Sequence, residues 1–371
     1  MTASIKKFLM GATLATGMSA IASSPAVATT LRPSNIQFST YNNLPQIETY
    51  LFSNPPAVET VNGIQRQVLN DITRDNVGKA VQALTDNSSA TNVELWYRGE
   101  TPQRVGFTAN LGTNTLKVES VTKADWADGV LATAWLNGFR NNYSGLMASI
   151  ATTPGSNLLN DFNTNFNSIV GHLRTNGFDV AGDPNIGDVT YNTQTGQLKV
   201  DLVGHLDVAG RYVDTRRQVP RSRQNPELIN NTNFIGNFST ADGRYTGDPT
   251  RRQGFSPDIA RNITGNTFFD SALIALATKA FRSNQAFQVS EIAKITFNDQ
   301  VSYAFGFNAT DSGAIAGNRN VINDSTSHTG IYTWTKNSPT NPPASVPEPS
   351  TILGLVAVGG LFAAGRKAQK A

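Results

Sequence analysis

The sequence predicts an α+β fold with largely antiparallel hairpins and several amphipathic helices. Three pairs of segments alternate apolar and polar residues and are joined by short polar turns, as in antiparallel hairpins. Other segments repeat apolar residues three or four positions apart, which is the spacing of one helical face. Because hairpins outnumber strand–helix–strand units, we expect the sheet to be antiparallel.

The helical segments are expected first at residues 58–84, where Val61, Ile64, Val68 and Ile72 fall on one face. Three further helices are expected from residue 125, at residues 156–176 and from residue 267. The strands are expected at 93–97, 104–110, 115–121, 186–191, 197–205, 292–297, 301–307 and 331–335.

Composition indicates a globular protein without disulfides. The chain has 371 residues and no cysteine, which excludes disulfide bonds, thiolate catalysis and cysteine-based zinc sites. The formal charge is +3, but residues outside 1–28 and 348–371 number 25 basic and 26 acidic. Overall charge therefore gives no support for nucleic acid as a partner.

The amino terminus has the order of features found in a secretory signal peptide. Lys6 and Lys7 precede an apolar and small-residue stretch, and Ala26-Val27-Ala28 supplies the small-x-small pattern that signal peptidase accepts. We expect residues 1–28 to be removed by signal peptidase, with cleavage governed by Ala26 and Ala28, so that the mature chain begins at Thr29.

The carboxy terminus has three parts. Residues 337–345 form a Pro/Asn/Ser linker that is expected to be extended. Pro347-Glu348-Pro349 follows, and its prolines keep the glutamate on an unpaired backbone. Next comes an uncharged segment at 350–365, about 24 Å long as a helix and therefore marginal as a permanent anchor. A basic cluster follows and would keep the C-terminal end of this segment in the cytoplasm; it consists of Arg366, Lys367 and Lys370.

Residues 346–371 resemble the PEP-CTERM sorting domain, which is read by exosortase, a membrane enzyme of bacteria that produce extracellular polysaccharide. The resemblance implies processing at or near Pro347-Glu348-Pro349, transient membrane association through the C-terminal helix, and delivery to the bacterial envelope or matrix. It covers only the tail and implies nothing about the fold of residues 29–336, which we expect to form one large domain or two closely packed ones.

Residues 211–261 are irregular and rich in arginine, with nine arginines against five acidic residues. Long loops of this kind are usually functional or disordered. Arginine holds carboxylate or sulfate groups through paired hydrogen bonds, so the candidate partners are an anionic polysaccharide and the acidic first half of the protein itself. The alternative is a solvated loop with no specific contacts. The candidate contacts are Arg216, Arg217, Arg221 and Arg223.

No catalytic, nucleotide-binding or cofactor motif is found. The three histidines show no metal-ligand spacing, and we expect His172 and His205 to be structural. Asp179, Asp183 and Asp188 share one loop, which leaves calcium open although the EF-hand spacing is absent.

Aromatic residues on an exposed strand could stack on sugars. We expect Trp96, Trp126 and Trp135 to lie in the core, whereas Tyr332 and Trp334 share one face of the last strand and are candidates for the surface.

The sequence therefore favours a non-enzymatic envelope or extracellular-matrix protein that is sorted by exosortase and associates with extracellular polysaccharide. The alternatives are a secreted hydrolase acting on polysaccharide, which would bring Asp and Glu together in a cleft, and a module binding a small ligand or calcium.

Overall fold

The computed structural model describes most of the chain between residues 30 and 337. Among these residues, no helix is both long and apolar enough to span a membrane. The described residues are 30–61, 64–95, 103–178, 181–208, 238–240, 252–255, 264–283, 285–317 and 328–337.

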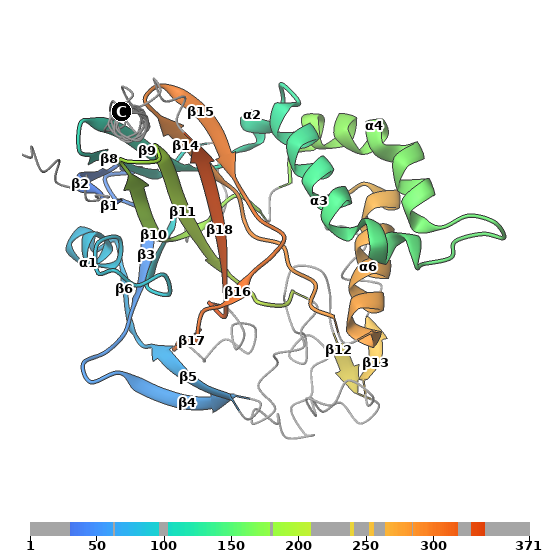
Figure 1. Cartoon of the computed structure of the whole chain (residues 1–371), viewed down its shortest axis with the longest axis horizontal. Helices are drawn as coiled ribbons and strands as arrows, with labels where there is room; N and C mark the ends of the chain where they lie inside the picture. The colour runs from blue at the N-terminus through green and yellow to red at the C-terminus, as the bar shows by residue number, and fades with distance from the viewer. Residues whose placement is uncertain are drawn as a thin grey trace, which may run out of the picture.

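Two sheets form a sandwich, and the larger of them curls into a half-barrel (Figure 1). The larger sheet has the order β16-β18-β11-β10-β7-β3-β6, with β1 paired to the end of β10. Its strands are β1 Thr30–Leu31, β3 Ile47–Leu51, β6 Asp71–Arg74, β7 Asn92–Leu95, β10 Asn185–Asn192, β11 Gln197–Gly204, β16 Thr310–Asp311 and β18 Gly330–Asn337.

The second sheet has the order β15-β14-β9-β8-β2 and is antiparallel throughout. One face of each strand packs into the core between the sheets, where Phe107, Val118 and Ile295 meet Val93 and Val200 of the larger sheet. Its strands are β2 Ser34–Phe38, β8 Gly106–Leu111, β9 Asn114–Ser120, β14 Ala293–Phe297 and β15 Gln300–Ala304.

Two smaller sheets lie away from the sandwich core. A three-stranded sheet at the bottom of Figure 1 has the order β17-β5-β4, and its β17–β5 pair is parallel. A two-stranded sheet falls within the arginine-rich segment. The strands are β4 Ala57–Val61, β5 Ile64–Leu69, β17 Ala314–Ala316, β12 Phe238–Thr240 and β13 Arg252–Phe255.

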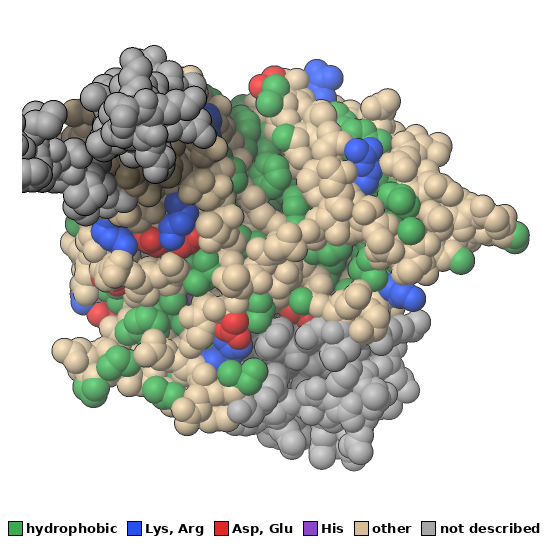
Figure 2. Space-filling model, in the orientation of Figure 1, with side chains coloured by type: hydrophobic (Ala, Val, Ile, Leu, Met, Phe, Trp, Pro, Cys, Tyr) green, Lys and Arg blue, Asp and Glu red, His purple; other side chains and the backbone are tan. Residues whose placement is uncertain are grey.

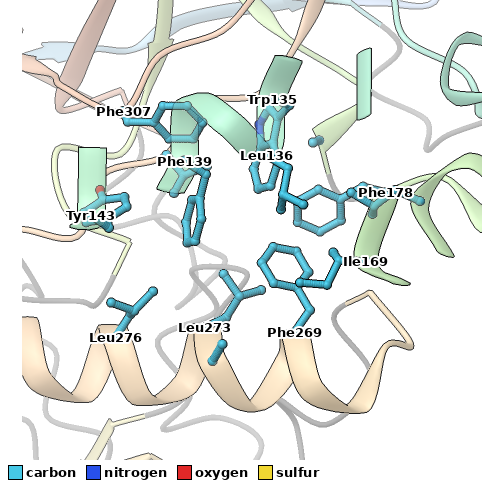
Figure 3. Close-up of a cluster of buried hydrophobic side chains, with 14 of the residues drawn as sticks. Trp135, Leu136, Phe139, Tyr143, Ile169, Phe178, Phe269, Leu273, Leu276 and Phe307 are labelled. Atoms are coloured by element: carbon cyan, nitrogen blue, oxygen red, sulfur yellow. The ribbon is translucent and has the colours of Figure 1, made fainter. Parts of the chain in front are cut away.

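A cluster of helices beside the sandwich has its own core, built largely from aromatic rings (Figure 3). Trp135 and Phe139 stack with ring centroids 5.4 Å apart, and Phe269 and Phe307 meet both of them edge-on. Such edge-on contacts favour fixed packing. The helices are α2 Lys123–Trp126, α3 Val130–Ala148, α4 Leu158–Asn176 and α6 Thr267–Arg282; the short α1 Val77–Ala83 packs on β3 and β7 instead.

The expected α+β class is wrong, because the described chain is mostly β-sheet. The largest single error is the helix expected at 58–84, where the chain forms β4, β5, β6 and the short α1. Val61 and Ile64 are paired across a two-residue connection, and the residues between them are Asn62-Gly63, a strong hairpin signal. The helix prediction failed because apolar residues three or four positions apart can also fall on several short successive strands.

Candidate functional site

The site residues expected from the sequence lie outside the described residues. This holds for the cleavage positions Ala26 and Ala28, for the sorting residues Pro347, Glu348 and Pro349, and for the four arginines of the proposed anion contact. Within the described fold, the candidate surfaces are formed by other residues.

The outer face of the five-stranded sheet carries an open groove of about 350 Å³. It crosses β2, β8, β9 and β14, and its lining side chains are mostly amides and hydroxyls. The lining residues are Asn35, Gln37, Thr108, Ala109, Asn110, Thr115, Leu116, Lys117, Thr296 and Asp299.

Strand register places four groove residues in one straight row. Gln37 pairs with Thr108, Thr108 with Lys117, and Lys117 with Thr296. Neighbouring strands are about 4.8 Å apart, so the row spans about 14 Å. Within the described chain, the side chains of Gln37, Thr108 and Thr296 make no recorded hydrogen bond, which leaves them available to a ligand.

The groove is close to neutral. Lys117 is its only cation, and its ammonium group lies 2.7 Å from Glu119 Oε1 on the same strand. Asp299 at the groove's end is exposed. Amides and hydroxyls both donate and accept hydrogen bonds, so this surface matches a hydroxyl-rich ligand better than a charged one.

The sequence contained part of this site. Alternation in β8 and β9 put Phe107, Ala109, Leu116 and Val118 inward, so the residues between them had to face outward. We expected those strands but assigned no role to their outer faces. Gln37 and Thr296 join the row only through pairing with distant strands, which no local pattern signals.

The outer face of the larger sheet holds a network of buried carboxylates and half-buried cations. Lys199 Nζ lies 2.9 Å from both Asp188 and Asp201, and Arg32 binds Asp188 from the other side. Thr333 also donates to Asp201, at 2.7 Å. Burial alone would lower the pKa of Lys199, but the two carboxylates outweigh it and raise that pKa. In Figure 2, acidic and basic side chains lie next to one another over this sheet.

A pair of glutamates lies on the same sheet. Glu48 and Glu94 are directly opposite in the β3–β7 pairing, and Tyr50 Oη lies 2.7 Å from Glu48 and 3.2 Å from Glu94. Arg74 donates to Glu48 at 2.7 Å. Glu48 and Tyr50 are almost fully buried. The two glutamates are thus held side by side on neighbouring strands and are bridged by the Tyr50 hydroxyl.

The structure also bears on the expectations for calcium and for the histidines. In the described part of the chain, no three His, Asp or Glu side chains are placed to hold a metal ion. Of the loop aspartates, Asp179 lies outside the described residues and Asp188 is held by ion pairs. His172 contacts the Thr264 carbonyl at 2.6 Å, as a structural histidine would.

Trp126 and Trp135 are buried, as expected, whereas Trp96 lies outside the described residues. Tyr332 and Trp334, the candidates for a surface pair, both turn toward the core. Tyr332 is 1% exposed and donates to the His205 carbonyl, and Trp334 packs against the sandwich core. Both side chains lie on the face of β18 that packs into the core between the sheets.

A second depression, of about 480 Å³, lies over the helices around Val130. Its two charged groups are already engaged: Asp128 accepts a hydrogen bond from the Val130 amide, and Arg174 donates to the Ala127 carbonyl. The sheet groove is therefore the better candidate for polar recognition.

The comparisons with known proteins identify the tail. Residues 345–368 match the family described as the PEP-CTERM protein-sorting motif. This confirms the resemblance seen at Pro347-Glu348-Pro349, and the motif implies exosortase-dependent sorting to the cell surface. No curated protein and no solved structure matches the chain significantly.

Proposed function

We propose that this chain is a non-enzymatic envelope or extracellular-matrix protein that associates with extracellular polysaccharide through the groove on its five-stranded sheet. The observation that carries the proposal is the sorting motif at 345–368, which directs the protein to the cell surface. Because sorting tails of this kind resemble those of bacteria that produce extracellular polysaccharide, polysaccharide is the hydroxyl-rich partner that we propose.

The groove supports this binding role by its shape and chemistry. It is shallow and open along the row from Gln37 to Thr296, so an extended chain can lie across it without a deep pocket. Its side chains offer paired donors and acceptors, which sugar hydroxyls require. Each such hydrogen bond contributes about 1 kcal/mol, so several weak contacts along a polymer would act together.

Processing belongs to the same proposal. Signal peptidase would remove residues 1–28, the uncharged segment at 350–365 would hold the precursor in the membrane for a time, and exosortase would then act near Glu348. No nucleic acid and no cofactor are required.

Affinity chromatography on the polysaccharide of the producing cells tests the binding role. Thr108→Val with Thr296→Val removes two groove hydroxyls while keeping β-branched side chains that suit strands. We expect retention to weaken about 30-fold, from two hydrogen bonds of about 1 kcal/mol each. Thr60→Val, on the exposed β4, is the matched control and should bind normally. Equal retention of the double variant would refute binding by the groove.

A secreted polysaccharide hydrolase is the second candidate, and the facing glutamates Glu48 and Glu94 favour it. Retaining glycosidases hold two carboxyl groups about 5–5.5 Å apart, and one hydroxyl bridges this pair. Incubating the protein with the same polysaccharide and measuring new reducing ends tests the idea. Activity that is lost in Glu94→Gln would establish the hydrolase; no release of sugar by the wild type would eliminate it.

A further inference from the structure

Both ends of the described fold leave the larger sheet in one row. Thr30 pairs with Asn192, Asn192 with Gln197, and Gln197 with Asn337. At about 4.8 Å per strand, Thr30 and Asn337 are about 14 Å apart. The segments that carry the two terminal signals therefore start from the same edge of the molecule.

Three hairpin turns lie at this same end, at residues 112–113, 193–196 and 298–299. Gly112 adopts φ +66°, and a Cβ placed there would come within 2.8 Å of Leu31 in β1. The Asn298 side chain donates to Asn114 at 2.8 Å, which joins the second and third strands of the smaller sheet at this end. We name this surface, with the row from Thr30 to Asn337, the turn end.

The turn end is short and nearly uncharged. Its turn residues are exposed threonine, glutamine, asparagine and glycine, with Asp299 the one charged side chain among the three turns. Among the described residues of this end, the tight turns leave no long loop that would hold the sheet away from a flat surface. Hydroxyl and amide groups can also remain hydrated beside lipid headgroups, and a single carboxylate gives little repulsion from anionic lipids.

The sorting tail keeps this end near the membrane. Fourteen residues separate Asn337 from Ile352, where the uncharged run begins, which allows a reach of at most about 50 Å at full extension. The uncharged run from Ile352 to Gly365 is followed by Arg366 and Lys367, a pattern that stops in a bilayer with its basic end in the cytoplasm.

We propose that the turn end is the surface that faces the lipid headgroups while the precursor is being sorted, and that the β4–β5 hairpin points away from the membrane. This orientation rests on the transient anchoring included in the proposed function. β18 runs from Gly330 to Asn337 and is about 23 Å long. In the proposed orientation the strand stands perpendicular to the membrane, so its start lies about 23 Å farther from the headgroups than its end. The β4–β5 hairpin lies beyond the start of β18 (Figure 1).

The absence of cysteine allows a direct test with single-cysteine labels on the full-length chain. Thr113→Cys and Thr195→Cys place a fluorophore at the turn end; Val58→Cys and Thr60→Cys place it on the exposed β4, where Val58 is 55% exposed. Each labelled protein is reconstituted into phosphatidylethanolamine/phosphatidylglycerol vesicles that carry a headgroup acceptor dye. Flotation confirms membrane association before energy transfer is measured.

We expect efficient energy transfer to the headgroup dye from fluorophores at positions 113 and 195. From positions 58 and 60 we expect energy transfer close to background. Floating protein with equal transfer from all four positions, or with the order reversed, overturns the orientation while the anchoring stands. Protein that does not float overturns the anchoring and the orientation together. Neither result affects the groove, which the polysaccharide columns test separately.

Discussion

Asp183 offers a test of the packing between the two sheets. Its carboxyl lies in the segment that leads into β10, where the backbone carbonyls of residues 181, 182 and 184 accept hydrogen bonds of 2.9–3.0 Å from three other elements. The segment is thus tied on three sides, which holds the carboxyl partly out of water. Burial raises the pKa of Asp183 from its ordinary value of 3.8 to about 6.

The direction of the effect follows from proton linkage. An acid whose pKa is raised by folding binds its proton more tightly in the folded state, so the free energy of unfolding falls as pH rises from about 4 to about 6. The difference corresponds to about 3 kcal/mol at neutral pH. Asp183→Asn removes the charge and keeps the shape. Because the side chain is only half-buried, we expect a gain of about 2 kcal/mol at pH 7.

Urea unfolding of the wild type and of Asp183→Asn, measured at pH 4 and pH 7, tests this expectation. In urea the variant should have a free energy of unfolding about 2 kcal/mol higher at pH 7, and a thermal scan should show a rise in Tm of about 4 °C; the two proteins should converge near pH 4. Asp299→Asn, at an exposed turn, serves as the control and should change little at either pH. A variant no more stable at pH 7 than the wild type would refute the account of Asp183 as a buried, costly charge.

Three further predictions concern an ion pair, the tail and the arginine-rich segment. Asp311→Asn removes the bidentate partner of the buried Arg66 and should lower the free energy of unfolding by about 1.5–3 kcal/mol. Asp71→Asn, which breaks the half-exposed pair with Lys79, should cost less than about 1 kcal/mol; equal losses in urea titrations would contradict this ranking. Glu348→Gln should leave export intact but block processing, so mass spectrometry should find a membrane-bound form with its tail; trimming as in the wild type would show that Glu348 is not read. Replacing four arginines by glutamine should abolish salt-sensitive retention on an anionic polysaccharide, because such contacts are screened over about 8 Å at physiological ionic strength; retention equal to that of the wild type would eliminate the contact. These four are Arg216, Arg217, Arg221 and Arg223.

The sequence by itself determined features that depend on neighbouring residues. The sorting motif is a contiguous string, and it was recognised at Pro347-Glu348-Pro349 and matched at 345–368. The hairpins β8–β9, β10–β11 and β14–β15 form where alternation and polar turns predicted them. Period-two alternation needs no partner to be read, because successive side chains of a strand point to opposite faces.

Only the tertiary structure decided which strands lie side by side. The segment at 58–84 forms strands in place of the expected long helix. β5 pairs with its neighbour β4 and with the distant β17, and these pairings satisfy its backbone hydrogen bonds. The groove row needs Gln37 beside Thr108, and the turn end needs Asn337 beside Gln197. Periodicity fixes the face that each residue takes within its own strand, but the register between distant strands is set by how their buried faces pack together.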